Sequence, residues 1–310
     1  MSRGGWDELA AWRDYRMGEE GDLWHRAIID PTFLRVIGPV RGLSILDLAC
    51  GNGYLTRRWA RRGAARVVGV DRSEPTLAGA RRRERDDPTG AEFLRRDSTH
   101  LAGLADASFD LVAANMALMD IRELDGTLRE VARVLRPQGR LVFSIGHPCF
   151  DLDDRSEWLV ERGRGPRAFW RETVWRKIRG YREERTLRVP WDVADGEIRW
   201  TTSYHRTLTT YSAALAAAGF AITRLEEPQP TPEAVRGSPQ GKYLLEIPLH
   251  LVVEARPLHG LGPARGRRAG ARRSGSRTSA GSPSRATRRS GSRARTRRTG
   301  SSGQGSTSGS

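Results

Sequence analysis

The sequence has few of the features that mark secreted, membrane-spanning or metal-dependent proteins. Its 310 residues include only two cysteines, Cys50 and Cys149, so no disulfide framework is expected and a reducing compartment fits. No apolar run reaches the roughly 18–20 residues that a membrane-spanning helix needs, and the N-terminal segment lacks the apolar stretch of a secretory signal. No set of histidine, cysteine and acidic residues has the spacing of metal ligands. We therefore expect a cytoplasmic protein without a membrane segment and without a catalytic metal.

Acidic residues are missing altogether from residues 261–310, which contain 13 arginines and therefore carry most of the net charge of +16. The segment has almost no apolar residues, so it cannot bury enough surface to fold and should be disordered. No aromatic residue separates the arginines, so the stacking element of single-strand nucleic-acid binders is also missing. Two interpretations remain open, a non-specific phosphate-binding arm and a dispensable extension, and we favour the second.

The most informative stretch of the chain runs from residue 45 to residue 74. An apolar run ends in a turn of small residues, a helix is expected from Tyr54, and a second apolar run ends in Asp71. The small residues let backbone N–H groups approach a ligand, and the helix N-terminus favours a negative group there. Asp71 is placed to accept hydrogen bonds from two ribose hydroxyls. The pattern therefore predicts the nucleoside-binding half of a doubly wound α/β sheet.

A third glycine is missing from this turn, which argues against a dinucleotide. The dinucleotide fingerprint G-x-G-x-x-G needs glycine at the position that Thr56 occupies. Asp47, inside the first strand, would repel a pyrophosphate but suits a ligand that carries an ammonium group. The motif D-L-A-C-G-N-G, residues 47–53, resembles motif I of the class I S-adenosylmethionine-dependent methyltransferases, in which D-L-G-C-G-x-G is usual. The difference is Ala49 in place of the first glycine, one small residue for another.

Further segments resemble the same family in the same order along the chain. The resemblance implies a Rossmann-like methyltransferase sheet of seven strands, the last one antiparallel, and S-adenosyl-L-methionine as the cofactor. In the family, the acid that follows the third strand, here Asp97, hydrogen-bonds the adenine amine. The matching segments are a third strand over 91–94, a fourth over 108–118, a helix, turn and fifth strand over 123–145, a helix and sixth strand over 207–228, and a seventh strand over 243–255.

The N-terminal segment, residues 1–30, is rich in aromatic residues and is expected to form a helical cap over the crevice. Its W-H-R stretch resembles the G-D-x-x-H-R segment of some actinobacterial small-molecule methyltransferases. This resemblance implies that Arg26 pairs with the methionine carboxylate, and the alternative is a solvated helix arginine. The predicted cofactor-binding residues are His25, Arg26, Asp47, Ala49, Gly51, Gly53, Tyr54, Leu55, Asp71, Arg72, Asp97, Ser98, Asn115 and Met116.

An insertion over residues 147–206 divides the main domain, residues 31–255, and the tail follows over 256–310. The insertion is longer than an ordinary connection, which is typical of lids and binding elements, and alternation along 172–189 predicts short antiparallel strands. Its tryptophans either form a small core of their own or pack a planar substrate, and we expect at least one to face the substrate. They are Trp158, Trp170, Trp175, Trp191 and Trp200.

Methyl transfer needs alignment of the acceptor and, for a protic acceptor, a base with a pKa near neutrality. His147 follows the fifth strand, at the edge of the sheet where ligands bind, and His205 ends the insertion. These two histidines are the predicted bases, with Tyr15 and Tyr204 as hydroxyl partners. The alternative for His147, which precedes Pro148, is that it only positions the lid.

The predicted function is transfer of a methyl group from S-adenosylmethionine to a small aromatic or apolar metabolite, on carbon, oxygen or nitrogen. The expected partner is a small-molecule substrate, with no membrane, with nucleic acid relevant to the tail alone, and with a monomer or homodimer as the assembly. One alternative is an RNA methyltransferase aided by the basic tail. The others are a binding module that keeps the cofactor without catalysis and a nucleotide oxidoreductase.

Overall fold

The structure is a computed structural model, and it describes residues 5–164, 170–194, 196–237 and 239–258. The predicted tail therefore lies outside the described residues from residue 259 on.

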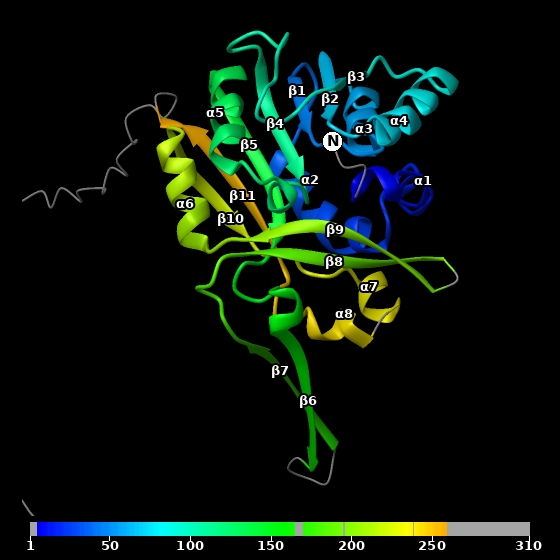
Figure 1. The fold of residues 1–310 in the computed structure, drawn as a ribbon, viewed down its shortest axis with the longest axis vertical. Coiled ribbons are helices and arrows are strands. Elements are labelled where there is room, and N and C mark those ends of the chain that lie inside the picture. Colours follow the sequence, from blue (N-terminus) through cyan, green and yellow to red (C-terminus); the bar gives the residue numbers. More distant parts are fainter. Residues whose placement is uncertain (1–4, 165–169, 195, 238, 259–310) are drawn as a thin grey trace, which may run out of the picture. The chain divides into compact units, whose positions relative to one another are not determined.

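A seven-stranded sheet forms the centre of the described chain, with the strand order β10-β11-β5-β4-β1-β2-β3 (Figure 1). Within the described ranges, β11 alone runs in the opposite direction to the other strands of this sheet. The predicted fold, a doubly wound sheet with an antiparallel last strand, is confirmed. The strands are β1 (Ser44–Leu48), β2 (Arg66–Asp71), β3 (Glu92–Arg95), β4 (Phe109–Asn115), β5 (Leu135–Gly146), β10 (Phe220–Glu226) and β11 (His250–Pro257).

The order of winding reverses between β1 and β4, which are parallel neighbours in the middle of the sheet. Strands β2 and β3 lie on one side of this pair, and β5 lies on the other. In sheets of this kind the loops diverge at such a reversal and leave a crevice beyond the carboxyl ends of the strands. The fold alone therefore places a ligand site beyond Leu48 and Asn115.

Helices cover both faces of the sheet because alternate residues of each strand point to opposite faces. They are α1 (Trp6–Met17), the π-helical turn η1 (His25–Ile29), α2 (Asp30–Ile37), α3 (Tyr54–Arg61), α4 (Glu74–Asp86), α5 (Leu124–Val134) and α6 (Leu208–Ala217). One face of the sheet receives α5 and α6 through buried residues such as Leu128 and Leu215. The other face receives α2 and α3 through Phe33 and Trp59. Burial on both faces explains why the central strands are continuous apolar runs.

Local sequence signals set the ends of the helices beside the site. Ser73 caps α4 by accepting a hydrogen bond from the Thr76 backbone N–H (3.3 Å), and Thr207 caps α6 in the same way through Thr210 (3.2 Å). Each cap satisfies one of the free N–H groups of a helix N-terminus. Gly219, with φ of 81°, follows α6 and turns the chain into β10.

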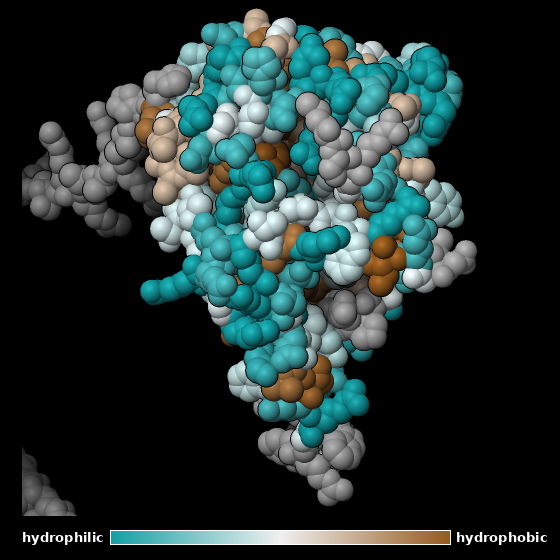
Figure 2. Space-filling view, viewed as in Figure 1, coloured by the Kyte–Doolittle hydropathy of each residue, from teal (hydrophilic) through white to brown (hydrophobic). Residues whose placement is uncertain are grey.

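The insertion predicted over residues 147–206 consists of two antiparallel hairpins outside the main sheet (Figure 1). The first pairs β6 (Ser156–Arg164) with β7 (Trp170–Ile178), and the second pairs β8 (Arg185–Ala194) with β9 (Glu197–His205). The predicted antiparallel strands are therefore present. Figure 2 shows a mostly hydrophilic surface with an apolar patch on the protruding β6–β7 hairpin, where Leu159 is exposed.

The seventh strand is shorter than predicted. It begins at His250 and not at residue 243, because the chain before it forms the short helices α7 (Pro232–Gly237) and α8 (Pro239–Tyr243). In addition, Pro248 lacks the N–H that a strand ladder needs. The strand also continues to Pro257, two residues past the predicted end of the domain. None of the described helices has both the length and the apolar character to cross a bilayer.

Candidate active site

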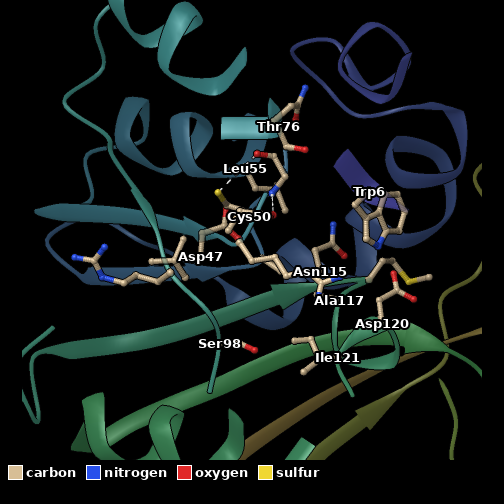
Figure 3. Close-up of a pocket in the computed structure, with 18 of the residues that line it drawn as sticks. Trp6, Asp47, Cys50, Leu55, Thr76, Ser98, Asn115, Ala117, Asp120 and Ile121 are labelled. Atoms are coloured by element: carbon tan, nitrogen blue, oxygen red, sulfur yellow. Dashed lines mark hydrogen bonds between the residues drawn. The ribbon is translucent and has the colours of Figure 1, made fainter. Parts of the chain in front are cut away.

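A cavity of about 320 Å³ lies beyond the carboxyl ends of β1, β2 and β4, at the reversal of the sheet (Figure 3). Its walls come from the ends of the strands, from the N-terminal segment and from the loop between β4 and α5. Most residues predicted to bind the cofactor line it. They are His25, Asp47, Ala49, Gly51, Tyr54, Leu55, Asp71, Arg72, Asp97, Ser98, Asn115 and Met116.

Three carboxyl groups line one part of the cavity, one at or near the end of each of three strands. Asp47 on β1 accepts a hydrogen bond from the Thr56 hydroxyl (2.5 Å). Asp71 ends β2 and accepts backbone N–H groups from Gly51 (3.0 Å) and Ser73 (2.9 Å). Asp97, after β3, lines the same cavity. Such a set of acceptors suits a ligand that carries an ammonium group, a ribose diol and an adenine amine.

Burial and hydrogen bonding give these carboxyl groups different pKa values. Burial raises the pKa of Asp47 to about 7, although the Thr56 hydroxyl partly opposes this shift. Burial also raises the pKa of Asp71, against the hydrogen bonds from its backbone partners. At Asp97, burial is outweighed by hydrogen bonds from Thr99, so its pKa lies below the usual value. Of these three carboxyl groups, Asp47 is therefore the one whose charge near neutral pH responds most to a bound cation.

The two glycines of the turn have different roles. Gly51 has φ of 57°, and a Cβ there would meet no atom within 4 Å, so the residue borders open space. Gly53 has φ of 75°, and a Cβ there would lie 2.5 Å from the Phe93 ring. Gly51 lines the cavity and Gly53 does not. The prediction that Gly53 contacts the cofactor is therefore not supported. The absence of a side chain at Gly53 instead lets the Phe93 ring pack closely against the turn.

The N-terminal segment closes the cavity from outside the sheet. Trp6, Arg13 and Met17 of α1 line it together with His25. Asp22 holds two of these residues, because it pairs with Arg13 (2.8 Å) and with Nδ1 of His25 (2.8 Å). The predicted cap thus reaches the cavity with several side chains.

A buried polar network joins the cap to the sheet. Asp30 accepts hydrogen bonds from the Tyr54 hydroxyl (3.1 Å) and from the Asn115 amide (2.9 Å), and burial raises its pKa. Arg26 takes no part in it. This residue pairs with Glu233 (2.9 Å), its side chain is 46% exposed, and it does not line the cavity. The structure therefore favours the solvated alternative for Arg26, because its turn of π-helix directs it away from the crevice.

None of the four predicted catalytic residues lines the cavity. His147 is buried beside β11, where Nδ1 accepts the Cys149 N–H (3.1 Å) and Nε2 lies 3.3 Å from Glu227. Burial lowers its pKa, although Glu227 opposes this. Nε2 of His205 is bonded to the Tyr181 carbonyl (2.8 Å). Both rings are therefore occupied by structural partners away from the crevice.

The predicted tyrosine partners are also outside the cavity. The Tyr15 side chain is 84% exposed on α1, and the Tyr204 ring lies against the Arg206 guanidinium at 5.2 Å. The structure thus places all four residues outside the described cavity. Their prediction followed from position along the chain and not from the direction of the side chain.

Several residues that line the cavity were not predicted for it, and the segment 117–123 after β4 supplies five of them. The only sequence signal for this segment was its place at the ligand-binding end of the fourth strand. Trp6 lies in the segment that was predicted as the helical cap, but no role in the site was predicted for it. Besides Trp6, the cavity residues that were not predicted are Arg13, Met17, Cys50, Asn52, Val70, Thr76, Arg96 and Thr99, together with the five from segment 117–123, which are Ala117, Asp120, Ile121, Arg122 and Glu123. Among the described residues, no group of three or more His, Cys, Asp or Glu is arranged to hold a metal ion.

The insertion acts on the cavity indirectly. No described residue of 147–206 lines it, so the expectation that a lid tryptophan faces the substrate is not supported. Instead the Trp191 ring packs against Trp6 (5.7 Å between centroids) and Trp12 (5.9 Å), and the Arg13 guanidinium lies over it at 5.4 Å. Trp191 thus holds the side of α1 that carries two cavity residues.

Replacing Trp191 with alanine should lower the free energy of unfolding by about 1–3 kcal/mol, because two aromatic pairs of about 0.5–1.5 kcal/mol each are lost. Trp175→Ala is the matched control, since Trp175 is 52% exposed on the other hairpin and should change stability by less than about 0.5 kcal/mol. Urea denaturation measures both values. Equal losses in the two variants would show that Trp191 does not anchor α1.

Taken together, the sheet order, the single reversed strand and the acids at the strand ends define a Rossmann-like nucleoside-binding enzyme of the class I methyltransferase type. Comparison with known proteins leads to the same class of enzyme. The profile of the family described as "Methyltransferase domain" matches residues 46–143. A crystal structure of an S-adenosylmethionine-dependent methyltransferase from Mesorhizobium loti is 31% identical, with a TM-score of 0.58, over 77% of this chain and 100% of that one.

Two curated relatives extend the comparison. An uncharacterised protein of Haemophilus influenzae is 30% identical over 64% of this chain and 75% of its own length. A demethylmenaquinone methyltransferase of Renibacterium salmoninarum is 34% identical over 128 residues, 41% of this chain and 49% of that protein. The chain belongs to the S-adenosylmethionine-dependent methyltransferases, and it is an enzyme whose cofactor is S-adenosyl-L-methionine.

Proposed function

We propose that this enzyme transfers the methyl group to a small aromatic or apolar metabolite that enters the same cavity as the cofactor. The observation that carries the proposal is the continuity of the cavity. One part is lined by the carboxyl groups at the strand ends, and another is walled by Trp6, Ala117 and Ile121. A concave site of about 320 Å³ with a few polar groups fits small ligands, and a nucleic-acid duplex would need an open basic surface.

The strand-end acids account for cofactor binding in this proposal. Asp47 balances the ammonium of the methionine part, Asp71 accepts the ribose hydroxyls, and Asp97 with Ser98 faces the adenine amine. When bound, the cofactor supplies the methyl group as part of a sulfonium that is already a good electrophile. The open space beside Gly51 supports this assignment, because it leaves room for a ligand against the backbone of the turn.

The protein's own contribution is alignment and exclusion of water. Trp6 from α1 and Ile121 from the loop after β4 line the cavity (Figure 3), and the proposal places the acceptor against them. Apolar walls hold the acceptor near the methyl group and remove competing water, and such positioning supplies a large part of the rate enhancement in two-substrate reactions.

The similarity to the demethylmenaquinone methyltransferase of Renibacterium salmoninarum is consistent with an aromatic acceptor but does not identify one. The chain spans about half the length of that relative, and the family profile matches the part of the chain from β1 into β5, without the insertion, β10 and β11. The choice of acceptor therefore rests on the walls of the cavity. The test is a metabolite screen with labelled cofactor, in which a small aromatic molecule should gain the labelled methyl group.

Affinity for S-adenosylmethionine should fall as the pH is lowered from 8 to 6. Burial places the pKa of Asp47 at about 7, so acid neutralises the group that balances the ammonium, and the dissociation constant should rise by up to about tenfold per pH unit below that pKa. Calorimetric titration of wild type and of Asp47→Asn measures this, and the variant should show a weaker slope. An affinity of the wild type that does not change with pH would contradict the role of Asp47.

A further inference from the structure

A short helical turn after β4 brings one carboxyl group into the acceptor side of the cavity. The turn η2 (Leu118–Asp120) ends in Asp120, and Asp120 lines the cavity together with Trp6. Figure 3 shows Trp6 and Asp120 on the same side of the cavity, beyond the end of β4, with Ala117 and Ile121 beside them. The acids at Asp47, Asp71 and Asp97 belong to the cofactor side, so Asp120 is not accounted for by cofactor binding.

The backbone that carries Asp120 is held by the end of the insertion. The buried guanidinium of Arg206 donates hydrogen bonds to the carbonyl groups of Leu118 (3.2 Å), Ile121 (2.6 Å) and Arg122 (2.8 Å). The Ser203 hydroxyl donates to the Met119 carbonyl (3.3 Å). These bonds occupy backbone carbonyls on both sides of Asp120 and fix the turn. Such rigid support is what a group that acts on a substrate needs.

The groups that face Asp120 leave its carboxyl free to exchange a proton near neutral pH. Burial raises its pKa to about 7. Arg13, Arg72 and the Ser203 hydroxyl, whose single proton is shared with the Met119 carbonyl, oppose this shift. Arg13 is already paired with Asp22 at 2.8 Å, so its charge is partly balanced. Tyr211 of α6 also faces this region, but burial raises the pKa of its hydroxyl to about 12 and it stays neutral.

The other charged residues of the same wall are Arg122 and Glu123, which line the cavity and are largely exposed. Their charges are screened by solvent and compensate one another in sign. Asp120 is therefore the carboxyl on the acceptor side whose protonation changes in the range where enzymes use general bases.

We propose that Asp120 is the general base of the reaction and that the acceptor is an aromatic molecule with an ionisable hydroxyl group. This inference rests on the proposed function. As the methyl group forms its bond to the acceptor, the electron pair of the carbon–sulfur bond stays on sulfur, and the hydroxyl proton passes to the Asp120 carboxylate. The protonated carboxyl then releases this proton to water. For methylation on oxygen this completes the reaction. For methylation on a ring carbon activated by the hydroxyl, the dienone that forms then loses its ring proton to water and its oxygen takes a proton back, so that one proton is released in either case.

The class of acceptor follows from Trp6 and Asp120, the two side chains that line this part of the cavity. The Trp6 ring offers an apolar, planar wall, which favours a ring. A carboxylate beside that wall favours a ligand that donates a hydrogen bond in the plane of its ring, as a phenolic hydroxyl does. An aromatic hydrocarbon without a hydroxyl would cover this half-buried carboxylate without offering it a hydrogen bond, which is costly.

The first experiment follows protonation and not turnover. Carbon-13 NMR of the full chain with labelled aspartate should show two carboxyl resonances that titrate near pH 7, one lost in Asp120→Asn and the other lost in Asp47→Asn. A third resonance, that of Asp151, should titrate near pH 6 in all variants, because burial raises the pKa of this residue to about 6. Asp125→Asn is the matched control, because Asp125 is an exposed residue of α5 close in sequence, and it should remove neither resonance. Titration of the Asp120 resonance at the ordinary aspartate pKa would overturn the proposal.

The second experiment uses a panel of naphthols and hydroquinones as acceptors, with the cofactor saturating so that protonation of Asp47 does not limit binding. For an acceptor that is methylated, kcat of the wild type should rise with pH through an apparent pKa near 7, because the base acts in its deprotonated form. Asp120→Asn should lower kcat by about 10²–10⁴ and remove this rise, while affinity for S-adenosylmethionine and the unfolding midpoint stay unchanged. Asp120→Glu should keep the rise with a lower kcat.

The outcomes separate this inference from the proposed function. Wild-type kcat in Asp120→Asn, or methylation only of molecules without a hydroxyl, would overturn the role of Asp120 and leave the methyltransferase of small molecules in place. Failure of the wild type to methylate any small molecule while it binds S-adenosylmethionine would instead overturn the proposed function.

Discussion

Replacing Asp71 with alanine should weaken the binding of S-adenosylmethionine by at least tenfold, and by as much as about a thousandfold. In the proposed placement of the cofactor this carboxylate accepts both ribose hydroxyls, and hydrogen bonds to a charged group contribute about 1.5–3 kcal/mol each before non-additivity. The same substitution removes the acceptor for the Gly51 and Ser73 N–H groups, so the turn beside the cofactor loses its support. Titration calorimetry measures the effect directly.

The control for this variant is Asp110→Ala. Asp110 also accepts a backbone N–H, that of Ser44 (2.8 Å), but at the opposite end of β1 and outside the cavity. It should lower stability without changing cofactor affinity. If Asp71→Ala binds S-adenosylmethionine as tightly as the wild type, Asp71 does not hold the ribose and the placement of the cofactor is wrong.

Replacing Gly53 with alanine should destabilise the protein by about 2–5 kcal/mol and reduce cofactor binding with it. A left-handed conformation costs a residue with a Cβ about 1–2 kcal/mol, and overpacking against the Phe93 ring, 2.5 Å from the new atom, adds about 1–3 kcal/mol. Since Gly53 precedes α3, relief of the clash would shift the turn that borders the cavity. Chemical denaturation and calorimetric titration measure the two effects.

Gly38→Ala separates the two contributions. Gly38 also has positive φ (67°), but a Cβ there would meet no atom within 4 Å, so this variant reports the backbone cost alone. The difference between the two variants is then the cost of the contact with Phe93. Equal destabilisation of the two variants would refute the packing role of Gly53.

The fold, and most of the residues that line the cavity at the strand ends, could be predicted from the sequence because their signals are local. Each buried strand is an apolar run, each ends in a recognisable residue such as Asp71 or Asn115, and parallel strands bring those ends to one edge. The strand order then follows from the family pattern. No knowledge of side-chain direction was needed for these predictions.

The acceptor side could not be predicted in the same way, because it depends on contacts between distant segments. His147 follows β5 as expected, but the direction of its ring is set by Glu227, 80 residues away. Asp120 enters the cavity because Arg206 holds its turn, 86 residues further on. The insertion was expected to touch the substrate, and it shapes the cavity from outside through Trp191 and Arg206.

The measurement that tests the central claim most directly is one incubation of the full chain with methyl-labelled S-adenosylmethionine, a metabolite extract and total RNA. The account predicts that label appears in one or a few small aromatic molecules, that RNA stays unlabelled, and that Asp71→Ala transfers much less at limiting cofactor. Label in RNA alone, or no transfer to any small molecule, would contradict it.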